Sequence, residues 1–146
     1  MKSSLLALAA IVGLFASAPA SADLKREIDC RVATILDSNF FEESLSRGEY
    51  PTVYIEKDQT GRLVEASVGA NINYEIQEGA TIRRLPKTAH NDRLRYILKY
   101  KERTDYVLIS VGQSGPRLGW NWGNLSVKEG NKAIRELAIL LCKAQP

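Results

Sequence analysis

Apolar and polar residues alternate along much of the middle of the chain. Val53 and Ile55 begin the pattern, turn residues at 58–61 interrupt it, and the longest alternating run follows over 64–76. Period-two alternation indicates β-strands with one buried face, and turn residues between two such runs indicate a hairpin. Because the run over 64–76 is longer than a usual strand, Gly69 marks either a bend within one strand or a break between two.

The same alternation returns further along the chain. It covers residues 94–100 and 106–111, and it returns at 118–122 after a loop rich in Ser, Gly and Pro. Residues 81–85 extend the sheet with a weaker pattern. Because short turns join these runs, the sequence predicts an antiparallel, curved sheet of about five to six strands.

Apolar residues near both ends of this region recur at spacings of three and four, which is typical of helices. The first set predicts a helix over 24–36. The second predicts a helix that begins at Ser126, where Glu129 completes a capping-box spacing. Residues 38–51 are expected to form a loop with one helical turn. The two sets are Leu24, Ile28, Val32, Ile35 and Leu36, and Ile134, Leu137, Ala138 and Leu141.

Together these elements predict an α+β fold. The antiparallel sheet is flanked by the N-terminal and the C-terminal helix, because a helix stripe is most simply buried against the apolar face of a sheet. Residues 23–146 have the length of one common globular domain, and no repeat divides them. We therefore expect a single domain over this range.

The first 22 residues have the order of a secretory signal peptide. Lys2 precedes an apolar run over 5–15, and small residues follow at 20–22. A membrane anchor is the less favoured interpretation, because a spanning helix needs about 20 apolar residues. We expect export to the periplasm or the extracellular space, with a mature chain that begins at Asp23 and has no membrane span.

Charge and composition exclude some classes of partner. The whole chain carries a formal net charge of +3, and removal of Lys2 with the leader lowers it by one. A value so near neutral does not predict nucleic-acid binding. The chain has one histidine and no cluster of His, Cys and carboxylates at metal-ligand spacing, so no metal or other cofactor is expected.

Cys30 and Cys142 are the two cysteines of the chain. Export would place them where disulfides form and persist, so a bond between them is predicted. It would close a loop for which the chain-entropy model assigns on the order of 4 to 5 kcal/mol. Two free buried thiols or an intermolecular pair are the alternatives. In a helix over 24–36, Cys30 would lie nearly opposite the apolar stripe, so either the helix starts later or the bond lies outside the core.

Candidate catalytic residues are few, and none is assigned. His90 would need Ser and Asp brought to it by the fold to form a triad. Residues 112–116 resemble the start of a nucleophile elbow, but Pro116 replaces the last glycine and a turn between strands is the favoured interpretation. Paired carboxylates are formal candidates for glycoside hydrolysis, with solvated surface as the simpler interpretation. These pairs are Glu42 with Glu43 and Glu75 with Glu78.

Basic residues gather on one side of the strand predicted near residue 100. Eight basic and two acidic residues fall within 83–103. Such a row predicts contact with an acidic exported protein or an anionic envelope component. Pairing across strands with Glu65, Glu75 and Glu78 is the favoured alternative. The candidate contact residues of the row are Arg93, Arg95, Lys99 and Lys101.

Trp120 and Trp122 are expected to point the same way from a strand, bracketed by Gly119 and Gly123. If exposed, they would form a stacking platform for sugars or a hot spot for a protein partner. Filling of the core is the favoured alternative.

The sequence therefore favours a small exported, non-enzymatic binding protein, such as an inhibitor or immunity-type partner of another exported protein. The basic row or the Trp pair would make the contact. The alternative is a small cell-envelope hydrolase that uses carboxylates or His90. A third interpretation, a curved sheet that holds an apolar molecule, has no particular residue to indicate it.

Overall fold

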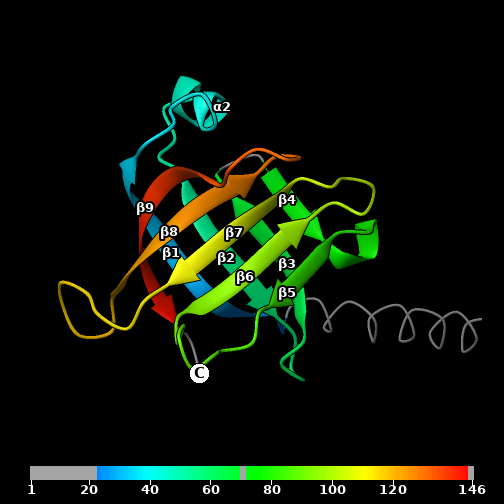
Figure 1. Ribbon diagram of the computed structural model, residues 1–146, viewed down its shortest axis with the longest axis vertical. Helices are drawn as coiled ribbons and strands as arrows, with labels where there is room; N and C mark the ends of the chain where they lie inside the picture. The colour runs from blue at the N-terminus through cyan, green and yellow to red at the C-terminus, as the bar shows by residue number, and fades with distance from the viewer. Residues whose placement is uncertain (1–22, 70–71, 145–146) are drawn as a thin grey trace, which may run out of the picture.

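The computed structural model describes residues 23–69 and 72–144 (Figure 1). In this range the regular secondary structure is almost entirely β-strand, with one short α-helix, α2 (Glu42–Ser46), and one 3-10 turn, η1 (Ile76–Glu78). The signal peptide predicted over 1–22 lies outside the described residues. The strands are β1 (Lys25–Ile35), β2 (Thr52–Lys57), β3 (Leu63–Val68), β4 (Ile72–Glu75), β5 (Thr81–Arg84), β6 (Leu94–Lys99), β7 (Tyr106–Val111), β8 (Asn121–Lys128) and β9 (Arg135–Ala144).

All nine of these strands belong to one antiparallel sheet in the order β4-β3-β2-β1-β9-β8-β7-β6-β5. Strands that follow each other in the chain pair in the sheet, except β4 and β5, which form its two edges, and β9 returns to pair with β1. The sheet curls strongly, so that its two edges approach each other in a near-barrel (Figure 1). Short turns between antiparallel strands favour this simple up-and-down order.

The prediction of an α+β fold with five to six strands and two flanking helices is wrong. The segment predicted as the N-terminal helix is β1, in which Ile28, Cys30 and Val32 are buried at a spacing of two. The pairing of β1 with β9 then shifts between Val32 and Thr34, so the next apolar residue, Ile35, follows after three. A β-bulge of this kind changes the phase of the alternation and imitates a helical spacing.

The C-terminal helix is absent as well, and a β-hairpin takes its place. Ser126 does not cap a helix. It is buried within β8, where the pairing with β9 shifts next to it, and it lies opposite Glu136. Gly130 turns the chain between the two strands with a positive φ of 54°, a conformation that glycine adopts without strain.

Several other predictions are confirmed. β2 and β3 form the predicted hairpin, and the helical turn expected within 38–51 is α2. The long alternating run is two strands, because Gly69 has a positive φ of 72° and ends β3. The weaker segment at 81–85 corresponds to β5.

The two edges of the sheet are connected by the chain itself. β4 pairs with β3 and β5 pairs with β6, and η1 joins β4 directly to β5. Tyr100, just after β6, crosses this seam and donates a hydrogen bond from its hydroxyl to the carbonyl of Asn73 in β4, at 2.8 Å. The segment that runs through β4, η1 and β5 therefore closes the barrel at the seam where the two edges of the sheet are not paired.

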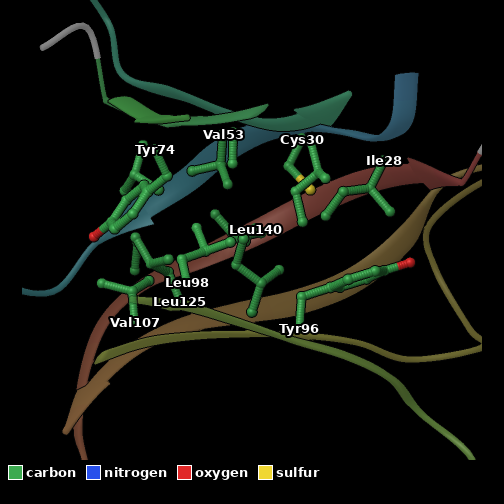
Figure 2. Packing of buried hydrophobic residues seen from close by; sticks show 14 of the residues in the cluster. Ile28, Cys30, Val53, Tyr74, Tyr96, Leu98, Val107, Leu125 and Leu140 are labelled. Atoms are coloured by element: carbon green, nitrogen blue, oxygen red, sulfur yellow. The ribbon is translucent and has the colours of Figure 1, made fainter. Parts of the chain in front are cut away.

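Apolar side chains from every strand fill the inside of the barrel. The predicted disulfide is confirmed: Cys30 and Cys142 are directly opposite each other in β1 and β9, and both are buried in this core. Figure 2 shows the disulfide among the core side chains and two tyrosines, Tyr74 and Tyr96, whose hydroxyl groups point to opposite ends of the cluster. Within the described ranges, no helix is long and apolar enough to cross a membrane.

Candidate functional site

The two tryptophans lie on the outer face of the barrel, at the beginning of β8. Asn121 is opposite Cys142, whose side chain is inside, so alternation places Trp120 and Trp122 outside. Trp122 is 43% exposed, and neither tryptophan belongs to the buried core. The alternative that they fill the core is therefore wrong.

Cationic side chains surround Trp120. The guanidinium carbon of Arg31 and the Nζ of Lys143 each lie 5.4 Å from its ring centroid, within the range of cation–π attraction. The strand register also places Arg31, Leu141 and Trp122 in one row across β1, β9 and β8. An open groove of about 320 Å³ runs along this region. We call the whole area the Trp surface, and it comprises Arg31, Arg117, Leu118, Trp120, Trp122, Leu141 and Lys143.

The loop between β7 and β8 holds the Trp surface in place. The amide of Trp122 donates to the carbonyl of Ser114 at 2.9 Å, and the amide of Gly112 donates to the carbonyl of Trp122 at 2.8 Å. Gly115 passes so close to this strand that an added Cβ would lie 1.6 Å from the carbonyl oxygen of Trp120. The segment 112–116 that resembles a nucleophile elbow is therefore part of the connection between two strands, and Leu118, just after it, is fully exposed.

The basic row does not form one continuous contact surface. Arg93 donates hydrogen bonds to Ser110 and to Asn124, and Arg95 donates to the carbonyl of Pro86 at 3.0 Å. Their hydrogen bonds thus connect β6 and the residue before it to β7, to β8 and to the loop after β5. Lys99 and Lys101 lie further along β6 and after it, and neither is close to the Trp surface in the strand order.

The alternative for the basic row, cross-strand pairing with glutamates, is also not observed. β6 pairs with β5 and β7, whereas Glu65 and Glu75 belong to β3 and β4. Among the described residues, the ion pairs of this end of the sheet involve other side chains, such as Arg84 with Glu27.

The candidate catalytic groups are not brought together. His90 is exposed in the loop between β5 and β6. Glu43 forms an ion pair with Arg47 on α2, while Glu75 lies opposite Glu65 across β3 and β4. Within the part of the chain that the structure describes, no three His, Cys, Asp or Glu side chains are placed to hold a metal ion.

A row of carboxylates on the outer face was missed from the sequence. Glu65 in β3 lies directly opposite Glu56 on one side and Glu75 on the other. Burial raises the pKa of Glu65, and the hydrogen bond and negative charge of Glu56 raise it further, while Arg26 opposes them. Repulsion among these carboxylates destabilises the sheet. Arg26 partly offsets this repulsion through its ion pair with Glu56 at 3.6 Å.

One end of the barrel is closed by a polar cluster that also escaped prediction. Glu27 accepts hydrogen bonds from Arg84 Nε at 2.6 Å and from the hydroxyl of Tyr96 at 2.8 Å, and its other oxygen is 3.4 Å from Lys57 Nζ. Burial by itself would raise the pKa of Glu27, but the hydrogen bonds and charges of these three partners outweigh burial and hold the pKa below its ordinary value.

The other end of the barrel opens into a pocket of about 340 Å³, which we call the tyrosine mouth. The rings of Tyr74 and Tyr100 stack there with centroids 4.7 Å apart and an interplanar angle of 22°. The sequence signal for this site was weak, because β4 and β6 are not paired and only closure of the barrel brings their tyrosines together. Its lining includes Phe40, Tyr74, Tyr100, Arg103, Asp105 and Glu129.

The chain matches no protein-family model, no curated protein and no solved structure. A function for this protein must therefore be inferred from the geometry of the Trp surface and of the two ends of the barrel.

Proposed function

We propose that this protein is a small exported, non-enzymatic binding protein whose Trp surface contacts an acidic region of another exported protein. The observation that carries the proposal is the outward pair Trp120 and Trp122, set among the cations Arg31, Arg117 and Lys143. Tryptophan and arginine are the residue types that most often dominate the energetics of protein interfaces.

The surroundings of the indole rings favour a protein over a sugar. Arg31 and Lys143 both lie near the ring of Trp120, which leaves less bare aromatic face for a sugar to stack on. Leu118 is fully exposed beside them, and Leu141 lines the groove. Apolar side chains at the centre with cations around them complement a partner that presents apolar side chains among carboxylates.

The scaffold beneath the Trp surface supports this interpretation. The surface spans β1, β9 and β8, and the Cys30–Cys142 disulfide joins the first two of these strands. A rigid surface loses little entropy on binding, which suits an inhibitor or immunity-type protein that recognises one partner. The disulfide also supports export, because such bonds persist in oxidising compartments.

No observation favours the alternative of a hydrolase. The structure leaves His90 exposed on a loop, and it gives the glutamates of the candidate pairs surface positions on α2, β4 and η1. We therefore do not propose a catalytic function.

Site-directed crosslinking tests the proposal. A photoreactive residue in place of Leu118, expressed in the natural host, should crosslink to one exported protein with an acidic surface. Trp122→Ala should weaken binding of the purified partner roughly 30-fold, a typical loss for an interface hot spot, and Arg31→Ala should reduce its dependence on salt. Tyr50→Ala, which changes another exposed aromatic residue on the connection before β2, is the matched control.

Two results would contradict the proposed protein contact. Crosslinking of the same proteins by the parent and by a Trp122→Ala background, with both shown to be folded by their thermal transitions, would remove the Trp surface as the contact. Crosslinking only to a carbohydrate polymer would replace the protein partner with a glycan.

A further inference from the structure

The tyrosine mouth lies where the core of the barrel reaches the surface. Four of the ten residues that line it are aromatic, and they come from segments that are far apart in the chain. Tyr74 is only 5% exposed, its hydroxyl group points to this end of the core (Figure 2), and its ring stacks on that of Tyr100. The faces of aromatic rings carry partial negative charge, so such a wall attracts cations. The four residues are Phe40, Tyr74, Tyr100 and Tyr106.

One side of this wall is held in place by a polar network. Asp37, just after β1, accepts hydrogen bonds from the amides of Asn39 at 3.1 Å and of Phe40 at 3.4 Å. Asp37 also pairs with Arg135, whose other nitrogen lies 2.8 Å from Glu129 at the far side of the mouth. The network fixes the segment that carries Phe40 to the hairpin of β8 and β9. A wall that is already ordered loses little entropy when a ligand binds.

Two carboxylates line the mouth, and both residues are half-buried. Glu129 is engaged by Arg135. Asp105 accepts a hydrogen bond from the amide of Gly130 at 2.9 Å, but it has no ion pair among the described residues. A neutral amide does not cancel the negative charge of a carboxylate. Asp105 can therefore pair with a cation that enters the mouth.

Among the described residues that line the mouth, Arg103 is the one cation. It is exposed, and it forms no ion pair with Asp105 or Glu129. Its guanidinium carbon lies 5.9 Å from the ring centroid of Tyr100, near the outer limit of cation–π attraction. Arg103 is thus held weakly and can turn into solvent. Two carboxylates against one guanidinium leave the lining with a net charge of −1, which favours a cationic ligand.

The size of the mouth and the chemistry of its walls narrow the class of cation. A volume of about 340 Å³ is at the lower end of the range for small-molecule sites, which occur often in the mouths of β-barrels. Hard metal ions need several oxygen ligands, and no three acidic side chains of the described residues are placed to supply them. A quaternary ammonium group instead packs its methyl groups on aromatic rings, and its charge interacts with their faces.

We propose that the tyrosine mouth binds a small quaternary ammonium compound. Its methyl groups contact the aromatic wall, and Asp105 supplies the opposite charge. Arg103 competes for the face of Tyr100 and turns away when the ligand binds. This site goes beyond the proposed protein contact and is separate from it. The Trp surface lies at the start of β8, whereas Glu129 in the mouth follows the end of that strand.

The first test compares two probes of the same shape and different charge. NMR titration of the full mature chain would use choline and 3,3-dimethylbutan-1-ol, a neutral alcohol in which carbon replaces the nitrogen. We expect choline to bind about tenfold more tightly than the alcohol. Tyr100→Leu removes an aromatic face and should weaken choline about tenfold, whereas Tyr100→Phe keeps the ring and should bind choline like the parent.

Variants of the charged residues give the more specific test. Arg103→Gln removes the competing cation, so it should strengthen choline binding severalfold. Asp105→Asn can still accept the hydrogen bond from Gly130 but has no charge, so it should weaken binding severalfold. Lys101→Gln makes the same charge change as Arg103→Gln in the same turn, but Lys101 does not line the mouth, so binding should stay unchanged.

Three results would overturn the inference. These are absence of choline binding up to millimolar concentration in both the parent and Arg103→Gln, equal or tighter binding of the neutral alcohol, and equal strengthening by Lys101→Gln and Arg103→Gln. Trp122→Ala should leave choline binding unchanged, so failure here is distinct from failure of the proposed protein contact. Sedimentation with phosphatidylcholine vesicles distinguishes the two sources of the ammonium group, because retention that choline reverses would assign it to a lipid headgroup rather than to a free compound.

Discussion

The hydroxyl of Tyr96 donates a 2.8 Å hydrogen bond to Oε2 of Glu27, and this bond joins β6 to β1 across the closed end of the barrel. The pairing of β1 with β2 shifts between Arg26 and Ile28, so Glu27 lies at an irregular point of its strand, and its side chain is only 11% exposed. Arg84 from β5 and Lys57 from β2 complete the cluster. Four strands thus meet at one carboxylate.

Replacement of this carboxylate should destabilise the barrel. Glu27→Gln keeps the shape but leaves Arg84 and Lys57 without their anion, so we expect the free energy of unfolding to fall by about 1 to 3 kcal/mol. Chemical denaturation measures the change, with the exposed Glu49→Gln as control. Tyr96→Phe should cost less, and the two substitutions together should cost less than their sum, because both change the same hydrogen bond: one removes its donor and the other makes its acceptor neutral. Full additivity would show that the bond contributes nothing.

The same cluster should give the protein an acid-sensitive component of stability. The pKa of Glu27 is lowered in the folded state, so its contribution is fully present above the ordinary value of 4.5 and is lost as the pH falls through the folded-state pKa. The stability difference between the parent and Glu27→Gln should therefore be constant at neutral pH and shrink below pH 4.5. Urea denaturation across this range measures it. A difference that stays constant down to pH 2 would exclude Glu27 as the source.

Glu65 should behave in the opposite sense. It faces Glu56 and Glu75 in neighbouring strands, and like charges directly opposite each other destabilise a sheet. Its pKa is raised, so the carboxylate disfavours folding at neutral pH and this penalty disappears as the pH falls through the folded-state pKa. Glu65→Gln should raise the free energy of unfolding at pH 7 by up to about 1 kcal/mol. Glu102→Gln in an exposed turn is the control, and a loss of stability in Glu65→Gln would contradict the expectation.

The disulfide should resist reductants in the folded protein and contribute strongly to stability. Cys30 and Cys142 are both fully buried and are separated by 112 residues in the sequence. Loss of such a bond typically lowers the free energy of unfolding by about 2 to 5 kcal/mol. Thiol labelling in dithiothreitol should therefore occur only when urea is added, and the Cys30→Ala, Cys142→Ala double variant should unfold at lower urea. Rapid labelling without urea would mean that this part of β1 and β9 opens easily.

Gly115 is the position where an added methyl group should disturb the Trp surface most. A Cβ there would lie 1.6 Å from the carbonyl of Trp120, so the loop must move. Gly115→Ala should lower the free energy of unfolding by about 1 to 3 kcal/mol and change the tryptophan emission. Ser114→Ala is the neighbouring control, because its carbonyl bond to Trp122 does not depend on the side chain. Unchanged emission in Gly115→Ala would show that the loop does not hold the indoles.

The errors in predicting the fold have a common physical origin. Ile28, Val32 and Ile35 have a helical spacing in the sequence, yet they belong to one strand whose pairing slips after Val32. A bulge inserts one residue and converts a spacing of two into a spacing of three. The pairing of β8 with β9 shifts in the same way at Leu125 and Ser126, so Leu137 and Ala138 are both buried in succession, which imitates part of a helical stripe. The strands between them in the chain, β2 to β7, were predicted because their alternation is largely regular, and the one shift between β2 and β3 falls at the end of β2, between Glu56 and Lys57.

Local patterns were sufficient for features that depend on neighbours in the chain. The sequence by itself determined the hairpin of β2 and β3, the common direction of Trp120 and Trp122, and the pair of cysteines, whereas the structure decided that the two tryptophans face outward. Only the tertiary structure decided that Tyr74 stacks on Tyr100, that Arg103 lies beside them, and that Glu27 meets Tyr96. These residues come together because the sheet curls until its two edges, β4 and β5, approach each other. Alternation along a strand indicates which face is buried but not which strands meet when the barrel closes.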